Sequence, residues 1–314
     1  MRPTTESDVL TLANIRRPKG RRITEYRFNE RQQIFTVAPT AKARSTVDKL
    51  ARAARAKQPV RAVLSPRRGV IQRVELLAAE EVRELERTRL LLENPDKTIR
   101  IDVARIDPIT FNVVDRYLKV PTFRLCTRIV PNYKTAKEFF DFCAKQSCHL
   151  PAPPSVTPCI PFQYVRDGCH ARAHKMRKIM KERYGYCCEK VFSFANRNDD
   201  DLAVRADKWG GCCVFWWFHV APLVRVRISI AGIKFVLAMV VDPSMFDKPV
   251  LLSTWLMAQQ NKGCAPNARV SMYSIQPGSA YTPANYTGTA FTTDPSYVAT
   301  DATLIGYKNY TTCP

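Results

Sequence analysis

A cysteine at the start of a patterned helix is the residue of this sequence best suited to covalent chemistry. Cys169 follows the turn signal Asp167-Gly168, and no proline or glycine interrupts the chain from there to Glu182, where apolar residues recur at helical spacing. A thiol in the first helical turn lies at the positive end of the helix dipole and near several cations, and both favour the thiolate. The pattern indicates a nucleophilic cysteine; a core or disulfide cysteine is the alternative.

A histidine and an aspartate follow on two predicted strands. The strand 213–223 carries His219, and the strand 234–242 ends at Asp242, directly before a proline. A hairpin that turns near residues 230–232 would place His219 within about two residues of Asp242. The imidazole and the carboxylate would then meet.

The order of these residues along the chain is typical of papain-like or transglutaminase-like sites. In such a site Cys169 attacks an acyl carbon, His219 takes and returns the proton, and Asp242 holds the imidazole in its orientation and tautomer. Backbone N–H groups at the helix start would meet the oxyanion. A lone histidine in an aromatic strand is more often a core residue, so the prediction rests on the three residues together.

Composition excludes several classes of protein. The 314 residues are enough for two domains, and no apolar run approaches the length of about 18 residues that a membrane span needs. The net charge of +21 is spread along the chain, without a basic tract interleaved with aromatic residues, so no specific nucleic-acid partner is expected. Because there is no CxxC pair and His170 and His174 lack an obvious third ligand, no metal is expected.

The 11 cysteines favour an oxidising compartment, and their odd number leaves at least one thiol free if the others pair within the chain. Cys148 and Cys159 flank a proline-rich loop and are expected to form a local disulfide. The partners of the adjacent cysteines at 187–188 and 212–213 stay open.

The chain divides into four segments. Residues 1–22 are polar and basic, without the apolar core of a signal peptide, and are expected to form a flexible tail. Residues 23–93 predict a small α+β domain, and residues 94–128 a connector whose many Lys and Arg residues suit a trypsin-like protease. Residues 129–314 predict a second α+β domain.

The expected elements follow from hydrophobic periodicity. After about residue 263 surface strands and loops are expected, without a long helix. The expected helices are 41–57, 79–92, 134–146 and 169–182, and the further strands are 26–28, 34–37, 60–64, 70–77 and 162–165.

Several of these motifs together resemble the protein-glutamine glutaminases, which are secreted bacterial enzymes. The similarity is carried mainly by residues 167–177, 212–221 and 242–246, and it covers about residues 129–265. It implies a papain/transglutaminase-like fold and hydrolysis of the side-chain amide of protein-bound glutamine to glutamate and ammonia, without metal or cofactor. The implied catalytic triad is Cys169, His219 and Asp242.

The resemblance extends into the family's inhibitory propeptide and implies that the chain is a zymogen. When the chain is matched to the family's propeptide without a gap, Gln33 falls at the position whose glutamine enters the active site like a substrate. Gln32 is the alternative. Residues 23–93 would then be the propeptide and 129–314 the catalytic domain, released by an activating protease.

The sequence also departs from the family. The connector is longer than the family's junction, Gln259 stands where the family has a cysteine, and the extra cysteines are Cys126, Cys143 and Cys187. The resemblance implies a secreted monomer that acts on proteins or peptides with accessible glutamine. The alternatives are a transglutaminase-like acyltransferase, a cysteine protease, a deamidating toxin or effector and, more remotely, a non-enzymatic basic polyanion-binding module.

Overall fold

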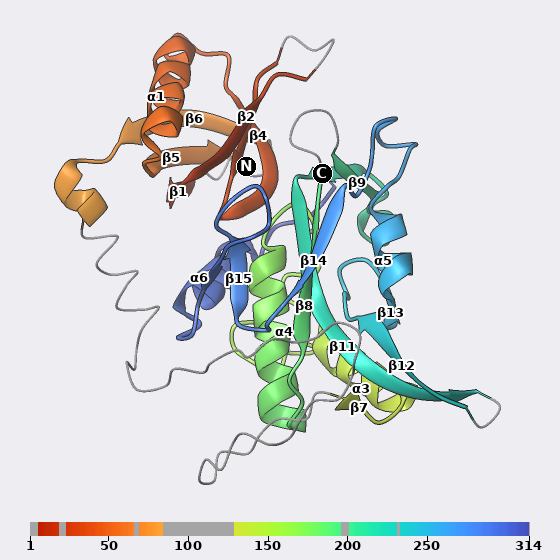
Figure 1. The fold of residues 1–314 in the computed structure, drawn as a ribbon. Helices are drawn as coiled ribbons and strands as arrows, with labels where there is room; N and C mark the ends of the chain where they lie inside the picture. Colours follow the sequence, from red (N-terminus) through yellow and green to blue (C-terminus); the bar gives the residue numbers. More distant parts are fainter. Residues whose placement is uncertain are drawn as a thin grey trace.

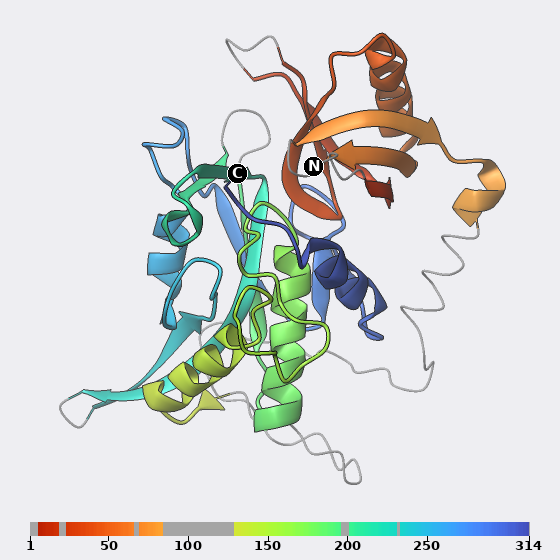
Figure 2. The same ribbon diagram turned by 180° about the vertical axis from the view of Figure 1, so that it is seen from behind.

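The computed structural model describes residues 6–18, 23–65, 69–83, 129–195, 201–230 and 233–313. We call residues 6–83 the N-terminal unit and residues 129–313 the C-terminal unit. The N-terminal unit lies over the end of the C-terminal unit at which the long helix α4 begins (Figures 1 and 2). The predicted connector 94–128 lies outside the described residues.

A twisted sheet packed on one helix forms the N-terminal unit. Leu50 of the helix and Phe35 of the sheet are fully buried in its core. Strand β1 pairs antiparallel with β5, and Leu10 in β1 is buried, so the prediction of a flexible tail is wrong for residues 6–16. The elements are β1 Glu6–Leu10, β2 Leu12–Arg16, β3 Glu25–Phe28, β4 Arg31–Val37, α1 Ala43–Ala56, β5 Val60–Ser65 and β6 Val70–Leu76.

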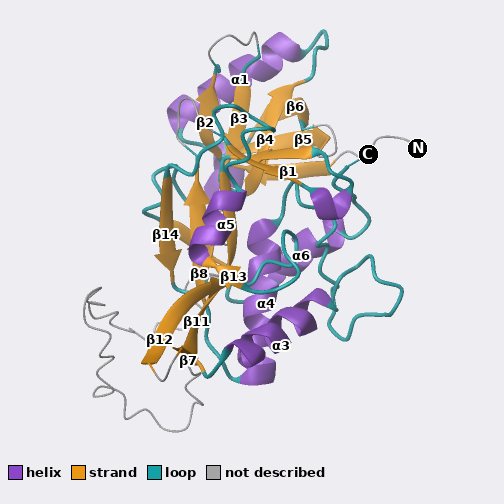
Figure 3. Cartoon of the chain, turned by 90° about the vertical axis from the view of Figure 1, so that its right-hand side faces the viewer, coloured by secondary structure: helices purple, strands orange, loops and turns teal. Residues whose placement is uncertain are grey.

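An antiparallel sheet in the order β13-β12-β11-β8-β14 forms the centre of the C-terminal unit, with β7 added parallel to β11. Helices α3 and α4 lie on one side of this sheet (Figure 3). The elements are β7 Ile129–Val130, α3 Tyr133–Ala144, α4 Cys169–Tyr184, β8 Glu189–Phe194, β11 Phe218–Ile230, β12 Ile233–Val240, β13 Val250–Leu251, α5 Leu252–Ala258 and β14 Met272–Gln276.

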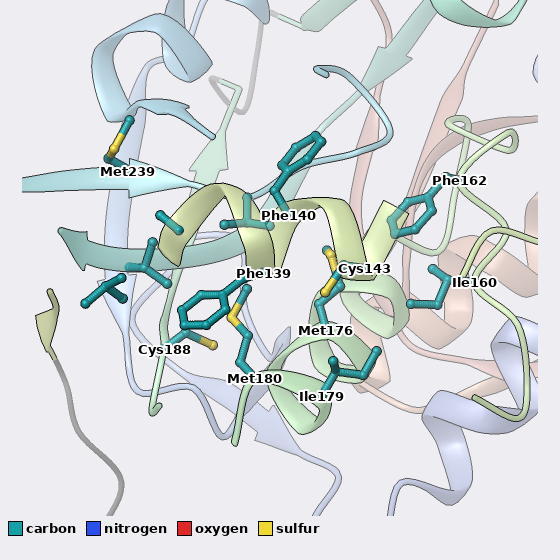
Figure 4. Packing of buried hydrophobic residues seen from close by; sticks show 14 of the residues in the cluster. Phe139, Phe140, Cys143, Ile160, Phe162, Met176, Ile179, Met180, Cys188 and Met239 are labelled. Atoms are coloured by element: carbon teal, nitrogen blue, oxygen red, sulfur yellow. The ribbon is translucent and has the colours of Figure 1, made fainter. Parts of the chain in front are cut away.

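The predicted hairpin of β11 and β12 is confirmed, with Leu223 opposite Val240 as the predicted register requires. Helix α4 packs on the sheet through an apolar cluster that contains Met176 and Met180 of α4, Phe139 of α3 and Met239 of β12 (Figure 4). Dense packing of this kind leaves the helix little freedom to shift along the sheet.

One strand pair joins the two units. Gln33 in β4 pairs antiparallel with Trp216 in β10, so the N-terminal sheet continues through β10 into β9. Strand β10 leads through the single residue Trp217 into β11. The remaining elements are β9 Leu202–Arg205, the short 3-10 helix η2 Asp207–Trp209, β10 Cys213–Trp216, β15 Ala280–Pro283, β16 Phe291–Thr293 and α6 Val298–Tyr307.

Three disulfides join described cysteines: Cys148–Cys159, which was predicted, Cys212–Cys313 and Cys213–Cys264. The last two attach the start of β10 to distant parts of the C-terminal unit. Cys187 is also disulfide-bonded, whereas Cys143, Cys169 and Cys188 are free.

Other predictions about local structure are wrong or only partly covered. Residues 162–165 form a turn and a loop, and helix α6 occupies part of the region predicted to hold only strands and loops. Of the predicted helix 79–92, residues 79–83 are helical and the rest lies outside the described residues. Within the described chain, no helix is long and apolar enough to cross a membrane.

Candidate active site

The first residue of α4 is Cys169, as predicted. Gly168 precedes it with a φ of 77°, and a Cβ at this position would lie 2.9 Å from the Tyr307 ring, so a side chain here meets both backbone strain and a clash. The Cys169 side chain is 1% exposed and packs with Phe218 and Val220 at the start of β11. The thiol therefore lies against the strand segment that also carries His219.

As predicted, the imidazole of His219 contacts the carboxylate of Asp242. The Nε2 atom of His219 lies 2.8 Å from Oδ2 of Asp242, and the indole Nε1–H of Trp255 donates to the same oxygen at 3.0 Å. The Ser244 backbone N–H donates to the other oxygen, Oδ1, at 3.2 Å. The sequence analysis assigned no role to Trp255, although this residue lies within the part of the chain that resembles the family.

Two indole rings hold the imidazole between them. The ring centroids of Trp216 and Trp255 lie 4.4 Å and 5.3 Å from that of His219, both in stacked orientation. Its Nδ1 atom is buried and has no hydrogen-bond partner among the described residues. With Nε2–H assigned as the donor to Asp242, Nδ1 is left as the basic nitrogen.

Burial determines the protonation of the pair. Loss of water around His219 lowers the pKa of its imidazole, although the contact with Asp242 acts in the opposite direction. Burial by itself raises the pKa of Asp242, but the contact with His219, the hydrogen bond from Trp255 and the charge of Arg172 together outweigh it, and this pKa lies below its usual value. The pair is therefore a neutral imidazole beside a carboxylate.

The thiol differs from the sequence-based prediction. Burial raises the pKa of Cys169 well above its ordinary value, against the lowering effects of the Arg172 charge and a hydrogen bond from the Val220 backbone. Arg172 and Lys175, two of the cations of this helix, are themselves 2% and 3% exposed, so they do not form a solvated charged face. In the uncleaved chain the thiol is thus protonated, because the site is closed to water.

The side chain that occupies the site is Gln32. Its Oε1 accepts a hydrogen bond from the Cys169 backbone N–H at 2.9 Å, and its Nε2 donates to the Val165 carbonyl at 3.0 Å. Gln33, the predicted residue, lines a cavity of about 270 Å³ at the boundary between the units, and its Oε1 lies 3.5 Å from the Tyr164 hydroxyl. Neighbouring residues of a strand point to opposite faces, so the two glutamines separate here.

Sequence reasoning also missed the role of Asp167, which it treated as a turn residue. Its carboxylate is fully buried and accepts hydrogen bonds from the Gly168 backbone N–H at 2.8 Å and the Gln32 backbone N–H at 3.1 Å. The Tyr307 hydroxyl donates to its other oxygen at 2.9 Å. Among the described residues, no group of His, Cys, Asp and Glu side chains is arranged to hold a metal ion.

The chain resembles solved structures along nearly its whole length. A pro-protein-glutaminase structure is 26% identical, with a TM-score of 0.70, and the match covers 98% of this chain and 95% of that one. A mutant of pro-protein-glutaminase matches at 27% identity, with a TM-score of 0.68 and coverage of 99% and 95%. Both matches include the N-terminal and the C-terminal unit, and they show a mixed α+β fold like that of the pro-form.

Shorter structures match the C-terminal unit more closely in sequence. Protein-glutaminase from Chryseobacterium proteolyticum is 33% identical, with a TM-score of 0.50, and the match covers 60% of this chain and 92% of that one. A family model described as Glutaminase matches residues 136–259. The chain belongs to the protein-glutaminase family. No curated protein matches it significantly.

One position at which the chain departs from the family is Gln259, and hydrogen bonds hold its side chain. Gln259, which stands at a family cysteine, is fully buried and accepts a hydrogen bond from the Ser193 hydroxyl at 2.6 Å. Its Nε2 donates to the Trp255 carbonyl at 2.9 Å. Hydrogen bonds therefore hold α5 against β8 at this position.

Proposed function

We propose that this chain is the zymogen of a protein-glutamine glutaminase, which hydrolyses the side-chain amide of protein-bound glutamine to glutamate and ammonia. The observation that carries the proposal is the carboxamide of Gln32, held between the Cys169 N–H and the Val165 carbonyl. A primary amide is the group that such an enzyme must bind. Its oxygen points to a backbone N–H at the start of a helix, where negative charge is stabilised.

The proposed catalytic residues are Cys169, His219 and Asp242, in a papain/transglutaminase-like arrangement. Nδ1 of His219 takes the thiol proton, the sulfur adds to the glutamine Cδ, and the Cys169 N–H donates to the oxyanion. The proton then passes to the leaving nitrogen, so ammonia departs and a thioester remains. Water, deprotonated by the same imidazole, cleaves the thioester to glutamate and restores the thiol.

Asp242 has a supporting role in this cycle. Its carboxylate binds Nε2–H, which keeps Nδ1 directed at proton transfer and stabilises the imidazolium that forms during it. The indole N–H of Trp255 fixes the carboxylate in turn. No step requires a metal or a cofactor.

The N-terminal unit is proposed to be the inhibitory propeptide, with Gln32 rather than Gln33 as the pseudo-substrate. It closes the site in two ways: it fills the amide position, and it excludes the water that thioester hydrolysis needs. Cleavage in the connector 94–128 by a trypsin-like protease would release the C-terminal unit. The disulfides fit an oxidising compartment, and we extend the proposal to a secreted enzyme that acts as a monomer on proteins with accessible glutamine.

Ammonia release from a casein-like protein tests this proposal, measured with the full chain before and after limited trypsin digestion. Activity is expected only after digestion and only with Cys169 intact, so Cys169→Ala should release none. Mass spectrometry of the products separates the related chemistries, because deamidation changes glutamine to glutamate, transglutamination forms cross-links and proteolysis makes new termini. Undiminished ammonia release by Cys169→Ala would overturn the assignment.

A further inference from the structure

The segment that fills the site shows how the C-terminal unit holds the main chain on either side of a glutamine. The backbone N–H of Gln32 donates to Asp167 at 3.1 Å, and its carbonyl accepts from the Trp217 backbone N–H at 3.3 Å. The indole N–H of Trp217 donates to the carbonyl of Arg31 at 2.8 Å. An extended peptide would thus be recognised at its glutamine and at the residue before it.

The side chain of Arg31, the residue before the glutamine, also makes specific contacts with the C-terminal unit. Nη1 of Arg31 lies 3.3 Å from Oδ2 of Asp167, and its guanidinium lies over the Tyr307 ring, 5.3 Å from the centroid. The Tyr307 hydroxyl donates to the same Oδ2 atom. Arg31 is 7% exposed although it carries a charge, so these contacts replace most of its water.

The negative charge that faces Arg31 and that remains after cleavage is the Asp167 carboxylate of the C-terminal unit. Arg31 also pairs with Asp8, but Asp8 belongs to the N-terminal unit and leaves with it. The Asp167 carboxylate also accepts hydrogen bonds from two neutral groups of the C-terminal unit, the Gly168 N–H and the Tyr307 hydroxyl. The nearby Arg172 donates to the main-chain carbonyl of Asp167, and its charge also interacts with the carboxylate. The Asp167 carboxylate stays with the C-terminal unit after cleavage, and Arg31 shows that it accepts a second cation.

We infer that Asp167 and Tyr307 form a specificity subsite that selects arginine or lysine directly before the target glutamine. The inference rests on the proposed function, because it takes the Gln32 segment as a copy of the bound substrate. It narrows the substrate class to extended segments with a basic residue followed by glutamine. Asp167 is a specificity-determining residue here, since it contacts both the substrate main chain and this side chain.

The test uses trypsin-activated full chain, freed of trypsin, and capped peptides that differ only at the residue before one glutamine. Arginine, lysine, citrulline and glutamate are compared by the kcat/KM of ammonia release. Citrulline matches arginine in shape but is neutral, so the arginine peptide is expected to exceed it about tenfold, with glutamate lowest. Equal values for all four peptides would overturn the subsite but leave the glutaminase function standing.

Asp167→Asn is the matched variant. The remaining side-chain oxygen can still accept the glutamine N–H, whereas the new amide carries no charge. The ratio of kcat/KM for the arginine peptide to that for the citrulline peptide should therefore fall to about one, and this ratio is the readout whatever the overall rate of the variant. The peptide series on the unchanged enzyme decides the question even if this variant fails to fold. Failure of every peptide and of casein to release ammonia would instead overturn the proposed function.

Discussion

Asp201 is the residue through which the C-terminal unit holds two arginines of the N-terminal unit. The guanidinium groups of Arg16 and Arg27 lie 2.8 Å and 2.9 Å from its Oδ1 atom. Asp201 is 7% exposed, Arg16 is 5% exposed and Arg27 is fully buried. Glu25 adds a second carboxylate, which pairs with Arg16 and whose charge also acts on Arg27. The substitution Asp201→Asn would remove the carboxylate that lies 2.9 Å from the buried Arg27 guanidinium.

The expected effect follows from the cost of leaving a buried charge unpaired. Removing one partner of a buried ion pair costs about 3–5 kcal/mol, and we take the lower end because Glu25 still pairs with Arg16 and its charge still acts on Arg27. A loss of about 3 kcal/mol in docking free energy raises the fraction of open chains about a hundredfold, since every 1.4 kcal/mol is tenfold. Uncleaved Asp201→Asn should therefore release ammonia about a hundred times faster than the small residual rate at which open molecules of the uncleaved parent do so.

The assay compares ammonia release by the uncleaved proteins, with a denaturing gel to show that each chain is intact. Asp207→Asn is the matched control, because Asp207 is exposed and pairs with Arg205 of the same unit. After trypsin digestion, Asp201→Asn and the parent should be equally active. Unchanged activity of uncleaved Asp201→Asn would refute the reasoning, and a loss of activity after cleavage would show that Asp201 supports the C-terminal unit itself.

Two further predictions concern buried hydrogen bonds and charges. Trp255→Phe removes a hydrogen-bond donor to Asp242, so kcat/KM should fall about tenfold. The pKa of Asp242 should rise, so the acid limb of the pH profile of kcat/KM should move to higher pH. An unchanged pH profile would contradict this role of Trp255. Burial lowers the pKa of Lys190 to about 7, so above that pH the unfolded chain binds a proton that the folded chain does not, until the ordinary pKa of lysine is passed. The free energy of unfolding of the uncleaved chain should therefore rise with pH over this range. In thermal unfolding experiments, Lys190→Met should gain less stability with rising pH than the parent. An equal gain in both proteins would count against the lowered pKa of Lys190.

Much of the candidate site could be predicted from the sequence because the relevant signals are local. The helix that begins at Cys169 follows from a turn and an uninterrupted periodic run, and the approach of His219 to Asp242 follows from the register of a single hairpin. The disulfide Cys148–Cys159 closes a short loop and was predictable for the same reason. Such features depend on residues near one another in the chain.

Other features were decided by contacts between distant segments. Residues 6–16 are polar and weakly patterned, yet they form strands because β5 and β3 offer edges to them. Gln32 reaches Cys169 and Gln33 does not, because the pairing of β4 with β10 determines which face of β4 points into the site. A one-residue change of register exchanges their roles, and no local pattern records it.

The sequence by itself therefore determined which residues carry the chemistry and the elements on which they lie. The tertiary structure decided the electrostatic state of the site: the helix start predicts a thiolate at Cys169, but the N-terminal unit excludes water, and burial raises the pKa of the thiol. It also decided that Asp167, a turn residue in the sequence, faces Arg31 and the glutamine main chain. Periodicity and turn signals act over a few residues, whereas burial and charge pairing depend on which distant segments meet.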